Sequence, residues 1–159
     1  MDPRLSVLHR ILESVGITPD VSSLSARKQI QKAIYLVQEA GLRLGYAYGW
    51  YVRGPYSRTL AHDYYAMAAA TSLGESVGAE LRDDVIERLQ PIKKISAPPP
   101  GSPLAPAEWL ELVASVHFLR TSRRLDDHGV DGVLQREKAT LAPFRAAAVS
   151  ALQEAGLLN

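Results

Sequence analysis

The most regular hydrophobic pattern of the chain lies within residues 26–40. Apolar residues spaced i, i+3, i+4 and i+7 recur there, namely Ile30, Ala33, Ile34 and Val37. This spacing places them on one face of an α-helix, and that face must be buried. A serine at position 22, 23 or 25 is a typical N-cap for this helix, and Gly41 is a typical stop after its last turn.

A stripe of polar residues runs along the edge of the buried face. At about 100° per residue, three side chains lie within about 40° of one another, and they are Arg27, Gln31 and Gln38. Lys28, Lys32 and Tyr35 are expected beside them on the exposed side of the helix. Two roles are open for the stripe: hydrogen bonds to a neighbouring loop, whose backbone groups need partners, or a recognition surface for another molecule.

An aromatic, glycine-rich segment follows at residues 42–53 and predicts a short strand or an extended loop. After it, Arg53-Gly54-Pro55-Tyr56 is predicted to be a rigid turn, because proline fixes its own φ and restricts the residue before it. Ser57 is then placed to cap the next helix. This segment is the natural hydrogen-bonding partner of the polar stripe.

Hydrophobic spacing and capping residues predict six further helices. They span residues 3–15, 58–70, 80–89, 108–119, 126–137 and 143–155. Pro91 is expected to end or kink the third of them, and Glu108 and Glu111 are expected on a polar face of the fourth. We therefore predict a mainly α fold: a single compact helical domain with winged-helix-like elements and at most one short strand pair.

A proline-rich segment sets the domain organisation. Residues 95–106 contain five prolines within the sequence SAPPPGSPLAP, which can continue neither a helix nor a sheet. We expect an extended connector between two helical halves of one domain, residues 1–94 and 107–159. The alternative is that these prolines form a ligand motif for a partner domain.

Composition limits the classes to which the protein can belong. A chain of 159 residues with 47% hydrophobic content is long enough to bury a core of its own. Because cysteine is absent, disulfides, thiolate nucleophiles and cysteine-ligated zinc are excluded. The sequence has neither a secretory signal nor a run of about 18 apolar residues, which predicts a soluble, cytoplasmic protein that does not enter a membrane.

Charge is unevenly distributed along the chain, although the formal net charge is only +1. Residues 1–60 hold eight Lys or Arg against four Asp or Glu, and residues 61–159 hold ten against thirteen. The basic N-terminal part can attract an acidic protein surface or a phosphate backbone. It lacks the dense basic stripe of a dedicated nucleic-acid binder, so nucleic acid is the secondary hypothesis for a partner.

Residues with catalytic or metal-binding chemistry are scattered. The four histidines fall on different predicted elements, and no HExxH spacing, GxSxG elbow or GxxxxGK[ST] loop is present. We therefore predict no metal, no cofactor and no catalytic site. One alternative is an anion site at the predicted helix start, formed by Arg53, Ser57 and Arg58. The competing interpretation is that this turn is purely structural.

Two runs of residues carry a resemblance to known families. The first is Arg27-x-x-x-Gln31-Lys32-x-x-Tyr35-Leu36, and the second is Tyr51-x-x-Gly54-Pro55-Tyr56-Ser57-x-x-Leu60-x-x-Asp63. They resemble the YwgA-like proteins and, more distantly, the Panacea or SocA-like antitoxins, in which a "QK-x-x-Y" helix is likewise followed by an aromatic segment and a "Y-x-x-GP" turn. The resemblance implies a helical module that neutralises or delivers a partner protein.

These observations together predict a small, non-enzymatic binding or adaptor protein that acts on a partner protein in a prokaryotic toxin–antitoxin or anti-phage defence setting. Its recognition surface is expected to comprise Arg27, Gln31, Lys32, Tyr35, Arg53, Tyr56 and Arg58. The alternative is a winged-helix-like nucleic-acid-binding regulator, since residues 126–155 look like a helix-turn-helix. The second helix of that pair carries a single cation, Arg145, where groove-reading helices carry several.

Overall fold

The computed structural model describes residues 1–78 and 80–159. The described chain forms seven α-helices, one short 3-10 helix and a two-stranded antiparallel sheet, which confirms the predicted mainly α fold. The elements in chain order are α1 (Pro3–Ser14), α2 (Leu24–Glu39), β1 (Gly49–Tyr51), β2 (Gly54–Tyr56), α3 (Arg58–Ser72), α4 (Asp83–Ile95), α5 (Pro106–Thr121), α6 (Asp127–Glu137), η1 (Ala142–Phe144) and α7 (Arg145–Glu154).

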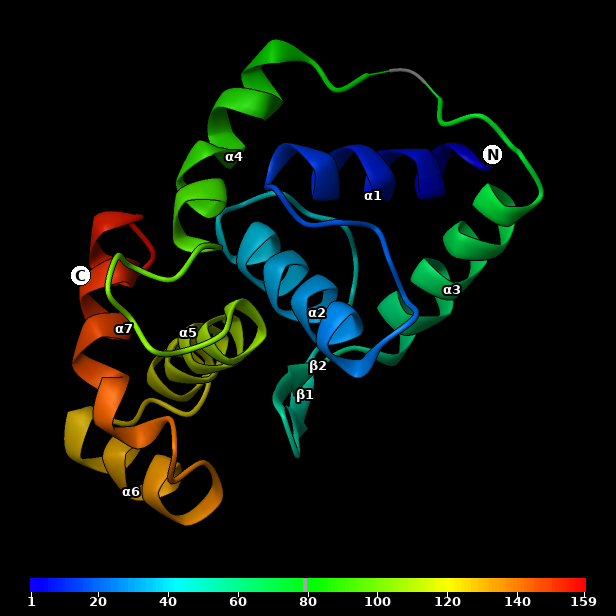
Figure 1. Ribbon diagram of the computed structural model, residues 1–159. Helices are drawn as coiled ribbons and strands as arrows, with labels where there is room; N and C mark the ends of the chain where they lie inside the picture. Colours follow the sequence, from blue (N-terminus) through cyan, green and yellow to red (C-terminus); the bar gives the residue numbers. More distant parts are fainter. Residues whose placement is uncertain (79) are drawn as a thin grey trace.

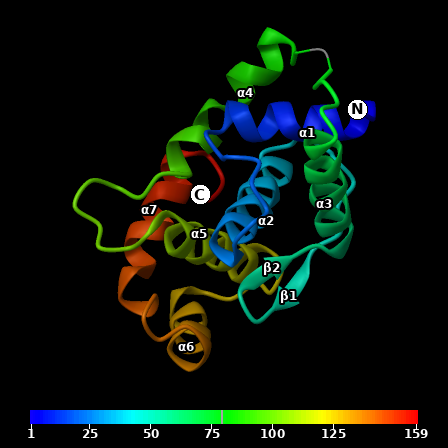
Figure 2. The same ribbon diagram turned by 45° about the vertical axis from the view of Figure 1, so that its right-hand side comes forward.

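The central element of the fold is α2. Figures 1 and 2 show it between α1 and α3 on one side and α5 with α7 on the other. All residues from 30 to 37 are buried, including Gln31, Lys32 and Tyr35. The prediction that Lys32 and Tyr35 lie on an exposed side is therefore wrong, because neighbouring elements cover this stretch of the helix all round and not only along its apolar stripe.

A second buried helix, α5, packs against α2, α7 and β2. Its pattern predicts a polar face with Glu108 and Glu111, yet Glu111 is buried together with Ser115 and His117. That prediction is wrong for Glu111 because the hairpin and α6 cover the side of α5 that the pattern assigns to solvent. The helix thus carries three polar side chains inside the protein; Glu111 and His117 have hydrogen-bond partners there, and the Ser115 hydroxyl has none among the described residues.

Helix starts follow the predicted caps. The Ser23 hydroxyl accepts a hydrogen bond from the Ala26 amide at the start of α2. The Ser57 hydroxyl accepts one from the Leu60 amide at the start of α3. By contrast, α4 begins later than predicted and contains Pro91 without ending there. It continues to Ile95, where the carbonyl accepts a hydrogen bond of 2.8 Å from the indole of Trp109.

The predicted turn at residues 53–56 is displaced in the structure. β1 and β2 form an antiparallel hairpin, and the turn between them consists of Val52 and Arg53. Gly54 and Pro55 belong to β2, so the rigid turn assigned to them is wrong. A proline is tolerated in a strand of such a narrow sheet because an edge strand leaves one row of amides unpaired.

Gly54 allows the hairpin to lie against α5. Its φ is +86°, a backbone conformation that favours glycine, and a Cβ at this position would overlap the Oγ of Ser115. The strand and the helix therefore approach each other at backbone distance. This contact fixes the position of the hairpin tip over the helices below.

Both halves of the chain contribute to one hydrophobic core. α2, from the first half, packs on α5 from the second, and α5 in turn packs on α7. Figure 2 shows the chain between α4 and α5 as a loop at the edge of the molecule. None of the described helices combines the length and hydrophobicity needed to cross a membrane.

Candidate functional site

Two glutamines of α2 bind backbone groups of the chain that follows this helix, one at the start of α3 and one in the aromatic segment. Gln31 donates from Nε2 to the Ser57 carbonyl at 2.8 Å and accepts from the Ser57 amide at 2.9 Å. Gln38 forms the same pair of bonds with Tyr46, at 3.0 and 2.9 Å. The structural interpretation of the polar stripe is thus confirmed for both glutamines, whereas the Arg27 guanidinium donates to the loop before α2.

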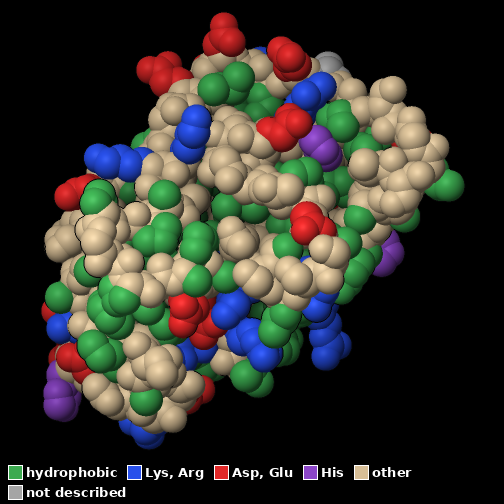
Figure 3. Space-filling model, in the orientation of Figure 1, with side chains coloured by type: hydrophobic (Ala, Val, Ile, Leu, Met, Phe, Trp, Pro, Cys, Tyr) green, Lys and Arg blue, Asp and Glu red, His purple; other side chains and the backbone are tan. Residues whose placement is uncertain are grey.

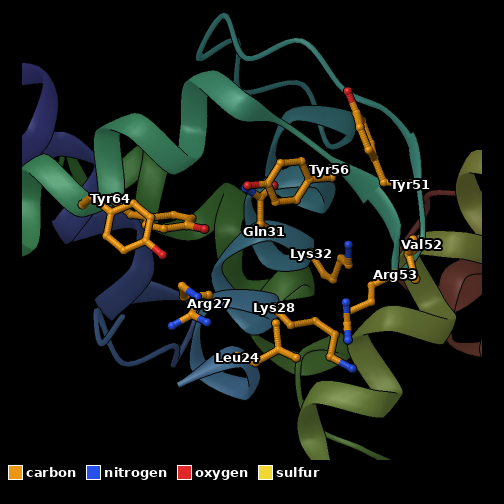
Figure 4. Close-up of a pocket in the computed structure, with 11 residues that line it drawn as sticks. Leu24, Arg27, Lys28, Gln31, Lys32, Tyr51, Val52, Arg53, Tyr56 and Tyr64 are labelled. Atoms are coloured by element: carbon orange, nitrogen blue, oxygen red, sulfur yellow. The ribbon is translucent and has the colours of Figure 1, made fainter. Parts of the chain in front are cut away.

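A pocket with a cavity volume of about 270 Å³ opens where the start of α2, the hairpin and α3 meet. We call it the Lys32 pocket. Four cationic side chains line it, namely Arg27, Lys28, Lys32 and Arg53, and its wall is completed by Gln31, Tyr56 and Tyr64. Figure 4 shows the nitrogen ends of Lys28, Lys32 and Arg53 on the same side of α2. The pocket is therefore strongly cationic.

Apolar side chains surround the mouth of this pocket. Four of the seven large hydrophobic residues that are exposed in the described chain belong to its lining, which we call the apolar rim: Leu24, Tyr51, Val52 and Tyr65. In Figure 3, Lys and Arg side chains gather over the hairpin and the start of α2 with hydrophobic side chains beside them. Such a concentration marks this face as the one most suited to contact another molecule.

Lys32 is the unusual member of the pocket. The residue is only 1% exposed, and its Nζ donates to the carbonyl oxygen of Pro55 at 2.6 Å. The pKa of Lys32 is lowered to about 7, chiefly by burial; Glu111 opposes this shift, and the positive charges of Lys138, Lys28 and Arg53 add to it. Near neutral pH this ammonium group therefore exchanges readily between its charged and uncharged forms.

The carboxylate of Glu111 accepts hydrogen bonds from two other lysines beside the site. Lys28 donates to its Oε1 at 2.8 Å and Lys138 to its Oε2 at 2.7 Å. Lys138 also donates to the carbonyl of Val52 at the hairpin tip. Burial favours the neutral acid, but the hydrogen bonds and charges of Lys138 and Lys28 outweigh it and lower the pKa of Glu111. Both oxygens of Glu111 are thus engaged by cations other than Lys32.

The sequence-based recognition set is partly gathered at this pocket. Five of its seven members line the cavity, namely Arg27, Gln31, Lys32, Arg53 and Tyr56. Tyr35 is wrong as a contact residue, because it does not line the pocket and its hydroxyl is hydrogen-bonded to His117 Nδ1 at 2.7 Å inside the core. Arg58 is exposed at the start of α3 but lies outside the lining of the pocket.

The alternative anion site at Ser57 is contradicted by the local hydrogen bonds. The amide of Ser57 already donates to Gln31, and its hydroxyl caps the Leu60 amide. Ser57 is also buried and lies outside the lining of the pocket. Of the proposed trio, only Arg53 faces the pocket, and Arg58 lies apart from it. The start of α3 is thus a structural element.

Several residues of the site are not predicted by the sequence. Glu111 and Lys138 are far apart in sequence, and their pairing has no local pattern. One signal was available: Glu111 is a carboxylate between apolar neighbours, Leu110 and Leu112, and a carboxylate that is buried needs a counter-ion. The rim residues Leu24, Val52 and Tyr65 carry no such signal, because isolated exposed hydrophobic residues are ordinary.

A second polar cluster surrounds Asp63 in the first half of α3. Asp63 is buried and accepts bonds of 2.6 and 2.8 Å from Arg4 and one of 2.7 Å from the Tyr46 hydroxyl. These bonds connect α1, α3 and the aromatic segment. Across the residues that the structure describes, no group of three or more His, Asp or Glu side chains is arranged to hold a metal ion.

Comparisons of the chain with models of protein families, with curated proteins and with solved structures give no match in any of the three. The resemblance to YwgA-like and Panacea proteins therefore remains a prediction from the sequence motifs. Functional inference depends on the chemistry of the Lys32 pocket and its apolar rim.

Proposed function

We propose that the protein is a non-enzymatic binding protein that captures a partner protein through the Lys32 pocket and its apolar rim. The observation that carries this proposal is the convergence of four exposed hydrophobic side chains around a cavity with four cations. Arg and Tyr are enriched among the residues that dominate protein–protein binding, and an apolar rim excludes water around them. The motif resemblance favours a toxin–antitoxin or anti-phage setting.

The hairpin tip supports this assignment because it combines exposure with a fixed position. Val52 is 82% exposed, yet its carbonyl accepts a hydrogen bond from Lys138, and the adjacent Gly54 lies against α5. A contact surface held in place loses little conformational entropy when a partner binds. The rim is therefore suited to a protein ligand that covers a broad area.

Site-specific photo-crosslinking in the native host tests the proposal. A photoreactive amino acid at Val52 is expected to link the protein to a defined partner protein. The same amino acid at Leu73, the residue directly after α3, is the matched control because Leu73 is 80% exposed and Val52 is 82% exposed. A protein partner at position 52 that is absent at position 73 and lost on Arg53→Ala supports the proposal. Identical products at both positions, or products that are nucleic acid alone, contradict it.

The nucleic-acid alternative gains no support from the second helix of the C-terminal pair. Arg145, its single cation, donates from Nε to Asp131 at 2.6 Å and lies 3.3 Å from Asp127. A guanidinium engaged by two carboxylates is a weak ligand for phosphate. Steep loss of binding with added salt is the outcome that would restore this alternative.

A further inference from the structure

The Lys32 pocket has an excess of positive charge that the described chain does not neutralise. Arg27, Lys28, Lys32 and Arg53 line it, while Glu111, which lies outside the lining, is shared by Lys28 and Lys138. The buried Lys32 ammonium bonds to a neutral carbonyl, that of Pro55. An anion that enters a poorly solvated site strongly stabilises the cations there.

We propose that the Lys32 pocket recognises a carboxylate, the side chain of an Asp or Glu within an acidic and hydrophobic segment of the partner protein, which supplies the missing counter-ion to Lys32 and Arg53. This inference rests on the proposed function and names the chemistry of its partner. The carboxylate occupies the cavity, and the neighbouring apolar residues of the segment contact the rim. Charge complementarity and the apolar rim thus select the same kind of segment.

The backbone around the pocket favours a carboxylate over a phosphate group. Phosphates in proteins are commonly held by free amides at a helix start. Here the amide of Ser57 donates to Gln31 and the amide of Leu60 donates to the Ser57 hydroxyl. The pocket is lined instead by side-chain cations and tyrosine rings, and one carboxylate suffices as the counter-ion for Lys32.

Binding of a carboxylate also changes the protonation of Lys32. The charged groups that face Lys32 are Lys28 on its own helix, Arg53 on the hairpin, Glu111 on α5 and Lys138 after α6. Burial and the positive charge of three of these four groups together hold the pKa of Lys32 at about 7. An incoming carboxylate reverses the balance and raises that pKa. Binding above neutral pH is therefore accompanied by proton uptake.

A displayed library of random short peptides, selected on the full chain, tests the inference. We expect enrichment of sequences with one fixed Asp or Glu flanked by aliphatic or aromatic residues. In calorimetry, replacing that acid by its amide in the best peptide should weaken binding by at least about thirtyfold. Lys32→Met should weaken it similarly, and Lys93→Met, at an exposed lysine of α4, is the matched control.

Proton uptake separates a contact role of Lys32 from a purely structural one. Titrations at pH 8 in buffers of different ionisation enthalpy should show uptake of about one proton with the wild type and none with Lys32→Met. Arg53→Ala provides a second variant and should also weaken binding. Because Arg53 is exposed on the hairpin, its replacement should not prevent folding.

Three results overturn the inference. In the first, the library yields no binding peptide, or yields peptides without a fixed Asp or Glu. In the second, a phosphoserine peptide binds more tightly than its glutamate counterpart. In the third, Lys32→Met leaves the affinity for the peptide unchanged. The crosslinking at Val52 is independent of these results. A specific protein crosslink without acidic selection would retain the proposed function and discard the carboxylate, whereas absence of that crosslink would remove the function itself.

Discussion

The side-chain amide of Gln31 forms hydrogen bonds with both backbone groups of Ser57, at 2.8 Å to the carbonyl and 2.9 Å from the amide. The backbone carbonyl of Gln31 in turn accepts a bond from the Tyr48 hydroxyl. One residue of the central helix therefore connects the aromatic segment with the start of α3. The floor of the Lys32 pocket depends on this connection, because Gln31 and Lys32 are neighbours on α2.

Replacing Gln31 by Leu should lower the free energy of unfolding by about 1–3 kcal/mol, since the buried Ser57 amide loses its partner while the Ser57 carbonyl keeps its bond from the Ala61 amide. The same replacement at Gln38 breaks an equivalent pair of bonds with Tyr46, but that site is only half-buried and water can substitute. A loss of about 1 kcal/mol is expected there. Urea denaturation of both variants measures the difference, and equal losses would contradict this account.

The sequence was sufficient to predict the parts of the fold that depend on neighbouring residues. Helical spacing located α2, and serine caps located the starts of α2 and α3. The edge position of Gln38 also predicted its bonds to Tyr46 in the aromatic segment, whereas Gln31 bonds to Ser57, just beyond that segment. All of these features are set within one helix or between a helix and the loop that follows it.

The remaining features depend on contacts between distant segments. The burial of Lys32 results from the packing of β2 and α5 around α2, and helical spacing predicts only the apolar stripe. The position of the hairpin depends on the close approach of Gly54 to Ser115. Rules for turn residues do not predict such a contact between distant segments. The shared carboxylate of Glu111 joins α2, α5 and the end of α6. These contacts appear only when the whole chain is folded.

Removing the charge of Glu111 should destabilise the protein strongly. Glu111→Gln leaves Lys138, which is 6% exposed, without its carboxylate. The free energy of unfolding is therefore expected to fall by about 3–5 kcal/mol at pH 7. Adding Lys138→Met to the same chain should recover part of this loss, because the buried ammonium is then absent. Denaturation of the two single variants and the double variant gives the coupling energy, and simple additivity would contradict the ion pair.

His117 should make the protein sensitive to acid. Burial lowers the pKa of His117 to about 4, against about 6.5 in an unfolded chain. Between these values the unfolded chain binds a proton that the native chain does not. The free energy of unfolding therefore falls as the pH is lowered from about 6.5 to 4, by roughly 1.4 kcal/mol per pH unit at most.

The substitution His117→Gln tests this dependence. The glutamine can still accept a hydrogen bond from the Tyr35 hydroxyl, but it takes up no proton. The variant should be less stable than the wild type at pH 7 by about 1–2 kcal/mol and should lose less stability on acidification. Urea denaturation from pH 7 to 4.5 measures both slopes, with His128→Gln on exposed α6 as the control. Parallel slopes for wild type and His117→Gln would refute the assignment.

Lys32 should lower the stability of the protein near neutral pH. Its pKa of about 7 lies below the 10.5 of an ordinary lysine because burial and neighbouring cations oppose its charge. Between these two values the unfolded chain retains a proton that the native chain releases, so stability rises as the pH increases through this range. Below about pH 7 both states are charged and the full penalty is present.

Lys32→Met should therefore raise the free energy of unfolding at pH 6 by about 1–4 kcal/mol, less the lost bond to Pro55. The advantage should shrink toward pH 9, where the wild-type amine is largely neutral. Lys93→Met should stay within about 0.5 kcal/mol of the wild type at both pH values. If Lys32→Met is instead the less stable protein at pH 6, the lysine is a structural residue. A gain would mean that the fold tolerates a costly cation at the floor of its pocket, which is the pattern expected of a group retained for binding.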